Sequence, residues 1–348
     1  MVEINRIQIT KASANGVNNS LNEVAFLGTA TSIPSDKVEL SKSSKNQSSK
    51  IKKIIIAIGV VVAIVAIGKG VLISKAAKKI NNMRNLPTEA AEEVFKSLED
   101  IETRFAQLEN NLPQVQDKFK EIFLRNDLTQ QQTLEILRGY KEVEKLGLTC
   151  SKKEYVEAVF KEAKKNYQIY SPNMKIEYNN PTIFDNACGV SLRDGSALYI
   201  TEHGLSKSRH ELFEVIHHEL RHSKQGEYVY CCFPDGKFTG NIYHEFLFLK
   251  IPNEAEYNKF LDEIAKKTGT EDFCDKKVQA EIDKKYNVKK IIEENLGNPD
   301  KNRVPSEFME TVEQIDRETR MNIDYFDKIE EKDAFKIGKM IHDLIFKY

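Results

Sequence analysis

Residues 213–222, which read Phe-Glu-Val-Ile-His-His-Glu-Leu-Arg-His, constrain the fold of this 348-residue chain more than any other stretch. Their apolar residues recur with helical spacing, so we expect a helix with one buried face and one polar face. His218 and His222 are four residues apart, which places them one turn above each other on the same face. Both imidazoles can therefore reach one metal ion. Glu219, about 100° further round the helix, can reach a water molecule beside that ion.

The alternative interpretation of this stretch is a surface helix with scattered histidines. The chain contains only seven histidines. A chance match to His-Glu-x-x-His in a chain of this length is on the order of a few per cent. The apolar helical frame and the strand predicted upstream also favour a metal site.

The pattern His218-Glu219-x-x-His222 resembles that of the zincin metallopeptidases. In metzincins a glycine follows three residues after the second histidine, and a third ligand follows three residues later. Gln225 and Tyr228 occupy those positions here, so the chain is instead similar to gluzincins, in which a glutamate further along completes the site. The resemblance implies one Zn²⁺ ion, a peptide or protein substrate, and Glu219 as the general base.

The third ligand implied by the resemblance is Glu307. The segment 304–310, Val-Pro-Ser-Glu-Phe-Met-Glu, looks like the Glu-Phe-Phe-x-Glu helix of the anthrax lethal factor-like group, whose first glutamate binds zinc. The interval after His222 is longer than in compact gluzincins. Three other glutamates therefore remain open as the third ligand: Glu310, Glu245 and Glu254.

Peptide hydrolysis also needs a substrate-binding strand and a donor to the developing oxyanion. The strand predicted at 196–200 is the candidate for holding a peptide by backbone pairing. The donor remains open among four residues: Tyr228, Tyr243, His244 and Tyr325. His217 points off the metal face, so we expect it to pack in the core or to support the site.

Residues 54–73 form an almost unbroken apolar run of twenty residues, interrupted only by Lys69. As a helix this run is about 30 Å long, the thickness of the hydrocarbon core of a bilayer. We therefore predict a single transmembrane helix over 51–74. Lysines flank both ends, so the charges leave the orientation open. Residues 1–50 are polar and are predicted to be largely disordered.

Residues 75–112 are predicted to form a helical stalk. Six apolar residues recur there at spacings of four and three: Val94, Leu98, Ile101, Phe105, Leu108 and Leu112. Such a heptad stripe is typical of a coiled coil, and it predicts self-association through 94–112. Packing on the chain's own domain is the equal alternative. Pro113 is expected to end the helix.

The remainder, 113–348, is predicted to be the zinc metallopeptidase domain, with its core at about 145–325. We expect an α+β fold that is mainly helical with a small antiparallel sheet. Strands at 175–178, 188–192 and 196–200 precede the histidine helix, and Arg193-Asp194-Gly195 is a good hairpin turn. Two charged helices at about 253–297 form an expected insertion.

The composition excludes some classes of function. The 52 basic and 53 acidic residues nearly cancel, which argues against a nucleic-acid-binding protein. Five cysteines without a Cys-x-x-Cys pair argue against a cysteine zinc site and lean towards a reducing compartment. Two alternatives to a membrane-anchored peptidase stay open: a zinc-containing peptide-binding module without catalysis, and a membrane-anchored interaction protein with incidental histidines.

Overall fold

The computed structural model describes residues 88–178, 187–251, 253–321 and 324–347. The chain divides into two units, Met1–Thr88 and Glu89–Tyr348, and almost all described residues belong to the second. The predicted disordered segment and transmembrane helix lie outside the described residues. Within those residues, no helix combines the length and the apolar character needed to cross a bilayer.

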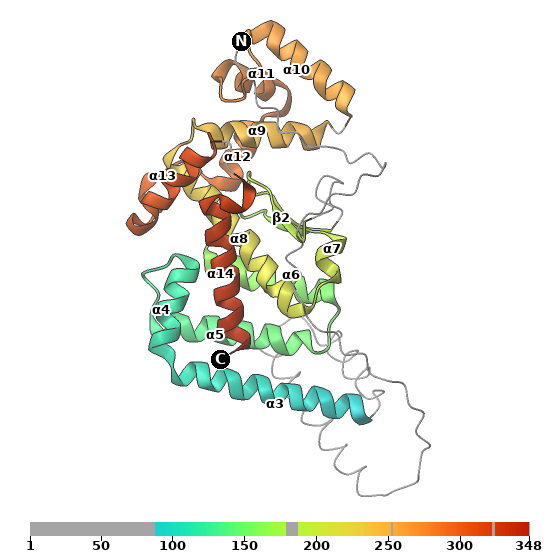
Figure 1. Ribbon diagram of the computed structural model, residues 1–348, viewed down its shortest axis with the longest axis vertical. Coiled ribbons are helices and arrows are strands. Elements are labelled where there is room, and N and C mark those ends of the chain that lie inside the picture. The colour runs from blue at the N-terminus through green and yellow to red at the C-terminus, as the bar shows by residue number, and fades with distance from the viewer. Residues whose placement is uncertain (1–87, 179–186, 252, 322–323, 348) are drawn as a thin grey trace, which may run out of the picture. The chain divides into compact units, whose positions relative to one another are not determined.

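The second unit is mainly helical and contains one small sheet, so the α+β class predicted from the sequence is confirmed (Figure 1). Its first helices are α3 (Thr88–Asn110), α4 (Leu112–Phe123), α5 (Gln130–Gly147), α6 (Lys152–Tyr167), α7 (Glu202–Ser206) and α8 (Arg209–Cys232). The later helices are α9 (Lys237–Lys250), α10 (Glu254–Thr268), α11 (Lys276–Tyr286), α12 (Val288–Leu296), α13 (Met309–Glu318) and α14 (Ile329–Phe346). Three short 3-10 helices are η2 (Lys301–Arg303), η3 (Ser306–Phe308) and η4 (Tyr325–Asp327).

Helix α3 packs on its own unit and does not stand apart as a stalk. Ile101, Phe105 and Leu108 of the heptad stripe are buried in the core formed by α4, α5, α6, α8 and α14. The seam predicted for self-association is therefore largely covered from within the same chain. Pro113 does not end α3 but lies in the first turn of α4, where the missing N–H of proline costs no hydrogen bond.

Local sequence explains where several helices begin. Thr129 and Ser151 each accept a hydrogen bond from a backbone N–H of the first turn, and each forms a reciprocal capping box. Ser208 does the same at the start of α8. Such caps satisfy backbone donors that the helix itself leaves unpaired.

Helix α8 is longer than the sequence predicts. The sequence 223–226, Ser-Lys-Gln-Gly, predicts a helix exit, but the helix continues through Gly226 to Cys232. A Cβ at Gly226 would lie 2.8 Å from Cζ of Phe238, so glycine serves here as a close contact with α9. Tertiary packing thus outweighs the weak helix propensity of glycine.

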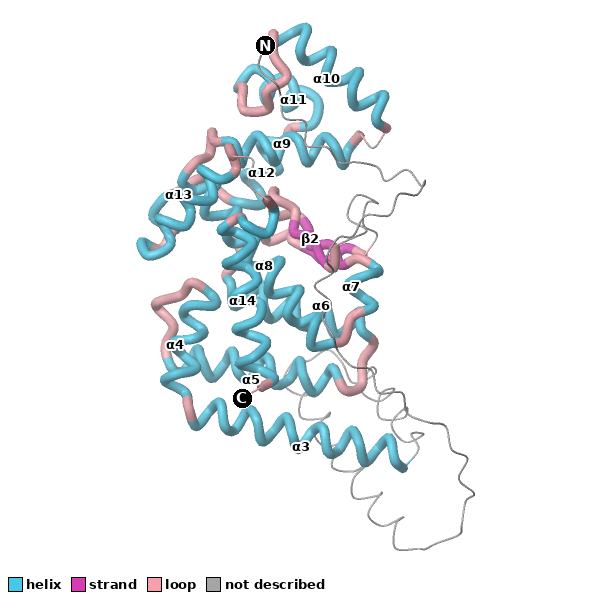
Figure 2. The backbone as a smooth tube through the Cα atoms, in the orientation of Figure 1, coloured by secondary structure: helices cyan, strands magenta, loops and turns pink. Residues whose placement is uncertain are grey.

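The sheet has the strand order β1-β3-β2, with β1 at Lys175–Glu177, β2 at Gly189–Ser191 and β3 at Ala197–Ile200 (Figure 2). The predicted hairpin is confirmed: β2 pairs antiparallel with β3, and Gly195 in the turn has a φ of 70°. Strand β1 pairs parallel with β3. The sheet is therefore mixed and not purely antiparallel as predicted.

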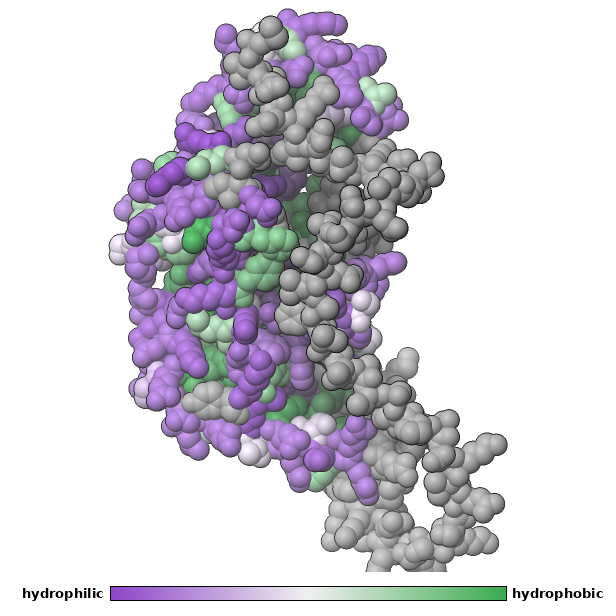
Figure 3. All heavy atoms as spheres, in the orientation of Figure 1, coloured by the Kyte–Doolittle hydropathy of each residue, from purple (hydrophilic) through white to green (hydrophobic). Residues whose placement is uncertain are grey.

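Two hydrophobic clusters adjoin α8. One contains the residues of α3 to α6, β3, the first half of α8 and α14. The other contains the second half of α8 and the apolar residues of α9 to α13, including the predicted insertion. The buried apolar residues of α8 that belong to the first cluster end at Leu220, and those of the second begin at Tyr228. Hydrophilic side chains cover most of the face drawn in Figure 3, with smaller groups of hydrophobic residues between them.

Candidate metal centre

Two helices bring together three side-chain atoms that could hold a metal ion. His218 and His222 project from α8, and Glu331 lies in the first turn of α14. The two Nε2 atoms are 3.1 Å apart, and Oε2 of Glu331 is 3.3 Å from Nε2 of His222 and 3.5 Å from Nε2 of His218. A tetrahedral zinc ion with ligands at about 2.0–2.1 Å keeps neighbouring ligand atoms roughly 3.3–3.4 Å apart. The three observed distances, 3.1, 3.3 and 3.5 Å, lie within about 0.3 Å of this spacing.

The electrostatics of the cluster favour a cation. All three side chains are largely buried, and two imidazole nitrogens that face each other at 3.1 Å need a shared proton or a cation between them. Burial lowers the pKa of His222, but the hydrogen bond to Glu331 and the charges of Glu219, Glu331 and Glu330 outweigh it and raise this pKa to about 9. A positive charge at this point is thus stabilised by the surrounding carboxylates.

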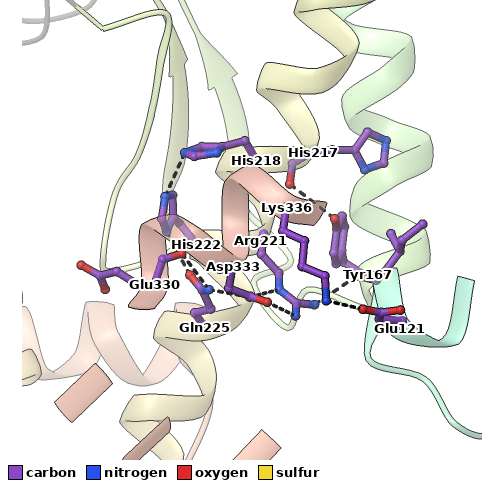
Figure 4. Close-up of polar contacts among 11 residues, drawn as sticks. Glu121, Tyr167, His217, His218, Arg221, His222, Gln225, Glu330, Asp333 and Lys336 are labelled. Atoms are coloured by element: carbon purple, nitrogen blue, oxygen red, sulfur yellow. Dashed lines mark hydrogen bonds and ion pairs between the residues drawn. The ribbon is translucent and has the colours of Figure 1, made fainter. Parts of the chain in front are cut away.

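Nδ1 of His222 has its own hydrogen-bond partner, so Nε2 is the ring nitrogen that could bind a metal ion. Nδ1 of His222 is 2.9 Å from Oε1 of Gln225, and Nε2 of Gln225 donates to Asp333 and to the backbone oxygen of Glu330. Asp333 in turn accepts two hydrogen bonds from the guanidinium of Arg221 (Figure 4). Such outer partners set the tautomer and the orientation of a ligating histidine.

His218 is held in a different way. Its Nδ1 is buried and has no hydrogen-bond partner within the described residues. Its ring instead packs against the ring of Phe335, with centroids 4.4 Å apart. A Cβ at Gly338 would lie 3.5 Å from Cβ of His218 and 3.2 Å from the backbone oxygen of Glu214. Glycine at this position lets α14 approach α8 closely enough to bring Glu331 to the histidines.

Strand β2 holds the side chain of Glu219. Oε2 of Glu219 accepts a hydrogen bond of 2.9 Å from the backbone N–H of Ser191. A Cβ at Gly189 would lie 2.9 Å from Cγ of Glu219, so the strand backbone passes directly over this side chain. Glu219 is 8% exposed, and its carboxylate therefore has a defined direction beside the histidines.

The structure does not bring Glu307 to this cluster. Glu307 is exposed in η3, where it accepts hydrogen bonds from Asn126 and Ser306. Glu331 lies beside His218 and His222 instead. The resemblance to a Glu-Phe-Phe-x-Glu helix rests on a short pattern, and such a pattern carries no information about which remote segments pack together.

The three rival glutamates also lie elsewhere. Glu245 accepts hydrogen bonds from the backbone and the guanidinium of Arg193. Glu254 is exposed in the first turn of α10, and Glu310 is exposed in the first turn of α13. One sequence signal for Glu331 was present: the last helix carries Glu331, Phe335 and Gly338 along one side. A glycine in an apolar helix indicates a close helix contact there.

His217 packs in the core, as one of the two expected outcomes. It is fully buried with its ring against Phe213 and Tyr167, and its Nε2 is 3.2 Å from the hydroxyl of Tyr140. Burial lowers the pKa of His217 to about 3, so the ring stays neutral at physiological pH. Figure 4 shows it on the opposite side of α8 from His218 and His222.

The predicted peptide-binding strand at 196–200 is the central strand of the sheet, because β3 pairs with both β1 and β2. Both of its edges are thus occupied, and the prediction is wrong. Strand β2 is the one beside α8, and within the described residues it pairs only with β3.

The candidate oxyanion donors are engaged elsewhere. Tyr243 donates to Asp283, Tyr228 packs against Phe308, and His244 packs against Tyr257 and Phe273. The side chain of Tyr325 lies outside the described residues.

Comparison of the chain with protein-family models, with curated proteins and with solved structures finds no match.

Proposed function

We propose that this chain is a zinc-dependent metallopeptidase that hydrolyses peptide bonds with water. The observation that carries the proposal is the meeting of His218, His222 and Glu331 at the spacing of zinc ligands, with Glu219 adjacent on the same helix. Two histidines and one glutamate are the protein ligands of several catalytic zinc sites, which keep a further position open. Glu331 replaces Glu307 as the third ligand in this proposal.

Each residue has a distinct task. His218, His222 and Glu331 would hold a zinc ion, which would supply Lewis-acid polarisation of the peptide carbonyl and a lowered pKa of bound water. Glu219 accepts a proton from the attacking water at its carboxylate. Glu219 then donates this proton to the nitrogen of the departing amine, so the base is restored after each turnover.

The surroundings support this division of tasks. The backbone N–H of Ser191 binds one oxygen of Glu219 and so restrains the carboxylate close to the site. Gln225 and Asp333 restrain the imidazole of His222. A site with prepositioned groups loses less conformational entropy during reaction than a mobile one.

We propose further that residues 51–74 anchor the enzyme in a membrane. The support is the apolar run at 54–73, whose length as a helix matches a bilayer. The expected result is that the full chain sediments with membranes and resists extraction by high salt and alkaline carbonate. Release of the chain by either treatment would contradict the anchor without affecting the peptidase proposal.

The test of the peptidase is a comparison of the wild type with Glu219→Gln. The wild type is expected to contain one zinc ion per chain and to cleave members of a random peptide library, and a chelator is expected to stop the cleavage. Glu219→Gln should retain the zinc and lose at least about 10²-fold in turnover, because the proton acceptor is gone.

Three results would contradict the proposal in different ways. Stoichiometric zinc and peptide binding without any cleavage would define a binding module without catalysis. Absence of zinc from a folded wild type would make the histidine cluster incidental. Normal cleavage by Glu219→Gln would remove Glu219 from its assigned role.

A further inference from the structure

Two exposed phenylalanines lie beside the candidate metal centre. Within the residues whose side chains are described, four large hydrophobic side chains are strongly exposed: Tyr170, Met321, Phe326 and Phe335. Phe326 is 65% exposed and Phe335 is 48% exposed. Their ring centroids are 6.2 Å apart, so they form one aromatic pair at the surface.

The pair adjoins a proposed metal ligand. The ring of Phe335 packs against the ring of His218 with centroids 4.4 Å apart. Phe335 also lies four residues after Glu331 on α14, and positions four apart on a helix share a face. A peptide whose carbonyl reaches the three ligands therefore brings a neighbouring side chain within reach of Phe335.

The core of the unit does not use these two rings. Helix α14 buries Ala334, Ile337 and Ile341 against α8 and its neighbours, and Phe335 lies off that apolar face. Exposed aromatic rings forgo the free energy of burial, and apolar surface left open in this way commonly marks a binding site. Because the pair lies beside His218, a substrate bound at the candidate metal centre would lie next to it.

We propose that Phe326 and Phe335 form a subsite for a large apolar side chain of the substrate, next to the peptide bond that is cleaved. This inference rests on the proposed peptidase function and adds the class of substrate. A leucine, methionine or aromatic side chain can pack against the exposed surface of the two rings by apolar contact, and a charged side chain there loses hydration without gaining a partner. Phe335 has a second task, since it also supports the ring of His218.

The test measures peptide binding, so that it does not depend on turnover. The parent protein is the full chain with Glu219→Gln and zinc. Fluorescent peptides are made in pairs that differ at one position, which is phenylalanine in one peptide and alanine in the other. This position is moved along the peptide from pair to pair, and the affinities within each pair are compared. We expect one position at which phenylalanine binds about tenfold tighter than alanine, the discrimination typical of an apolar pocket.

Two substitutions are then added to this parent, with one matched control. Phe326→Ser should reduce the preference to below about threefold with no change in zinc content, because Phe326 is not one of the three proposed zinc ligands. Phe335→Ser should reduce it equally and is also expected to weaken zinc binding. Tyr170→Ser removes an equally exposed aromatic ring that packs on Arg303, and it should leave the preference unchanged.

The outcomes separate this inference from the proposed function. One result would overturn the subsite alone. In it, the wild type binds zinc and cleaves peptides, but the preference for phenylalanine over alanine survives both Phe326→Ser and Phe335→Ser. A change of oligomeric state on Phe326→Ser with an unchanged preference would also overturn it and assign the pair to a contact between copies. A wild type with neither zinc nor cleavage would overturn both.

Discussion

Glu144 is a buried carboxyl group that the candidate site does not use. It lies in α5, accepts a hydrogen bond of 2.7 Å from the hydroxyl of Tyr155, and is 4.0 Å from the guanidinium of Arg104. Burial raises the pKa of Glu144 to about 7, and the hydrogen bond from Tyr155 and the charges of Arg104 and Arg209 oppose the rise only in part. The group is therefore protonated in the folded chain over a pH range in which the unfolded chain has lost the proton.

This difference predicts a pH dependence of stability. A pKa that is higher in the folded than in the unfolded state contributes stability below about pH 4.5, and that contribution is lost as the pH rises through about 7. At one pKa unit per 1.36 kcal/mol, the loss is up to about 3 kcal/mol. Glu144→Gln has no carboxyl group to titrate at this position and so lacks this loss. The free energy of unfolding of Glu144→Gln minus that of the wild type should therefore rise by up to that amount from pH 5 to pH 8.

Urea unfolding at the two pH values measures the effect. Glu142→Gln is the matched control, because Glu142 lies in the same helix and is exposed, with only a surface contact to Lys145. A difference between Glu144→Gln and wild type that is the same at pH 5 and pH 8 would show that Glu144 keeps an ordinary pKa.

Single residues also show where sequence reasoning succeeds and fails. His218, Glu219 and His222 are recognisable because their relation is local: one turn of helix decides which side chains meet. The third candidate ligand is not local, since Glu331 lies 109 residues beyond His222. The chain has 53 acidic residues, and spacing alone does not choose among them.

At the level of secondary-structure elements, the contact between β2 and α8 decides the direction of Glu219. Strand β2 pairs with β3. The hydroxyl of Thr201, the residue after β3, donates hydrogen bonds to the backbone oxygens of Ala187 and Cys188. Gly189 then allows the strand to pass over Cγ of Glu219 and Cγ1 of Val215. The backbone of β2 is thus held between β3 and α8.

Gly189→Ala should push β2 away from α8. The added methyl group would lie 2.9 Å from two carbon atoms of α8, and such overpacking costs about 1–3 kcal/mol. The bond from Ser191 to Glu219 lengthens as a result, so we expect a fall in kcat of at least about tenfold. Zinc content should stay at one per chain, because none of the three ligands is on β2.

Val190→Ala is the control for this variant, because successive side chains of a strand point to opposite faces. It should keep the wild-type kcat. A Gly189→Ala protein with normal kcat and normal stability would show that the close approach of β2 has no part in the positioning of Glu219.

The elements were predicted unevenly from the sequence, for physical reasons. The hairpin turn at Gly195 depends on neighbouring residues and was predicted. The caps of α5 and α6 also depend on neighbouring residues. The order of the strands and the continuation of α8 past Gly226 depend on contacts with remote segments. Taken alone, Gly226 predicts the end of a helix. The close contact with Phe238 explains why a glycine lies inside α8 instead.

At the level of the whole molecule, the three candidate ligands tie α14 to α8. A ligand that binds only the folded state stabilises it by mass action, by about 2.7 kcal/mol at a concentration of 100 times Kd. Zinc should therefore raise the Tm of the chain, and a chelator should lower it. Glu331→Gln should lose most of this shift, because an amide oxygen is a weaker zinc ligand than a carboxylate.

Thermal unfolding with zinc and with chelator measures this linkage, with Glu307→Gln as the matched control. Glu307 is the third ligand that the sequence resemblance implies. Because Glu307 is exposed in η3, Glu307→Gln is expected to show the same zinc-dependent rise in Tm as the wild type. The opposite result, a shift that is lost in Glu307→Gln and kept in Glu331→Gln, would contradict the geometry of the candidate site.

The amino-acid sequence by itself determined the helical class of the domain, the start of several helices, the hairpin and the facing pair His218 and His222, because each depends on interactions within a few residues. Only the tertiary structure decided that Glu331 meets this pair, that β2 and not β3 lies over Glu219, and that α3 packs on its own domain. These outcomes depend on which remote surfaces bury one another, and burial is a property of the assembled core that short sequence patterns do not encode.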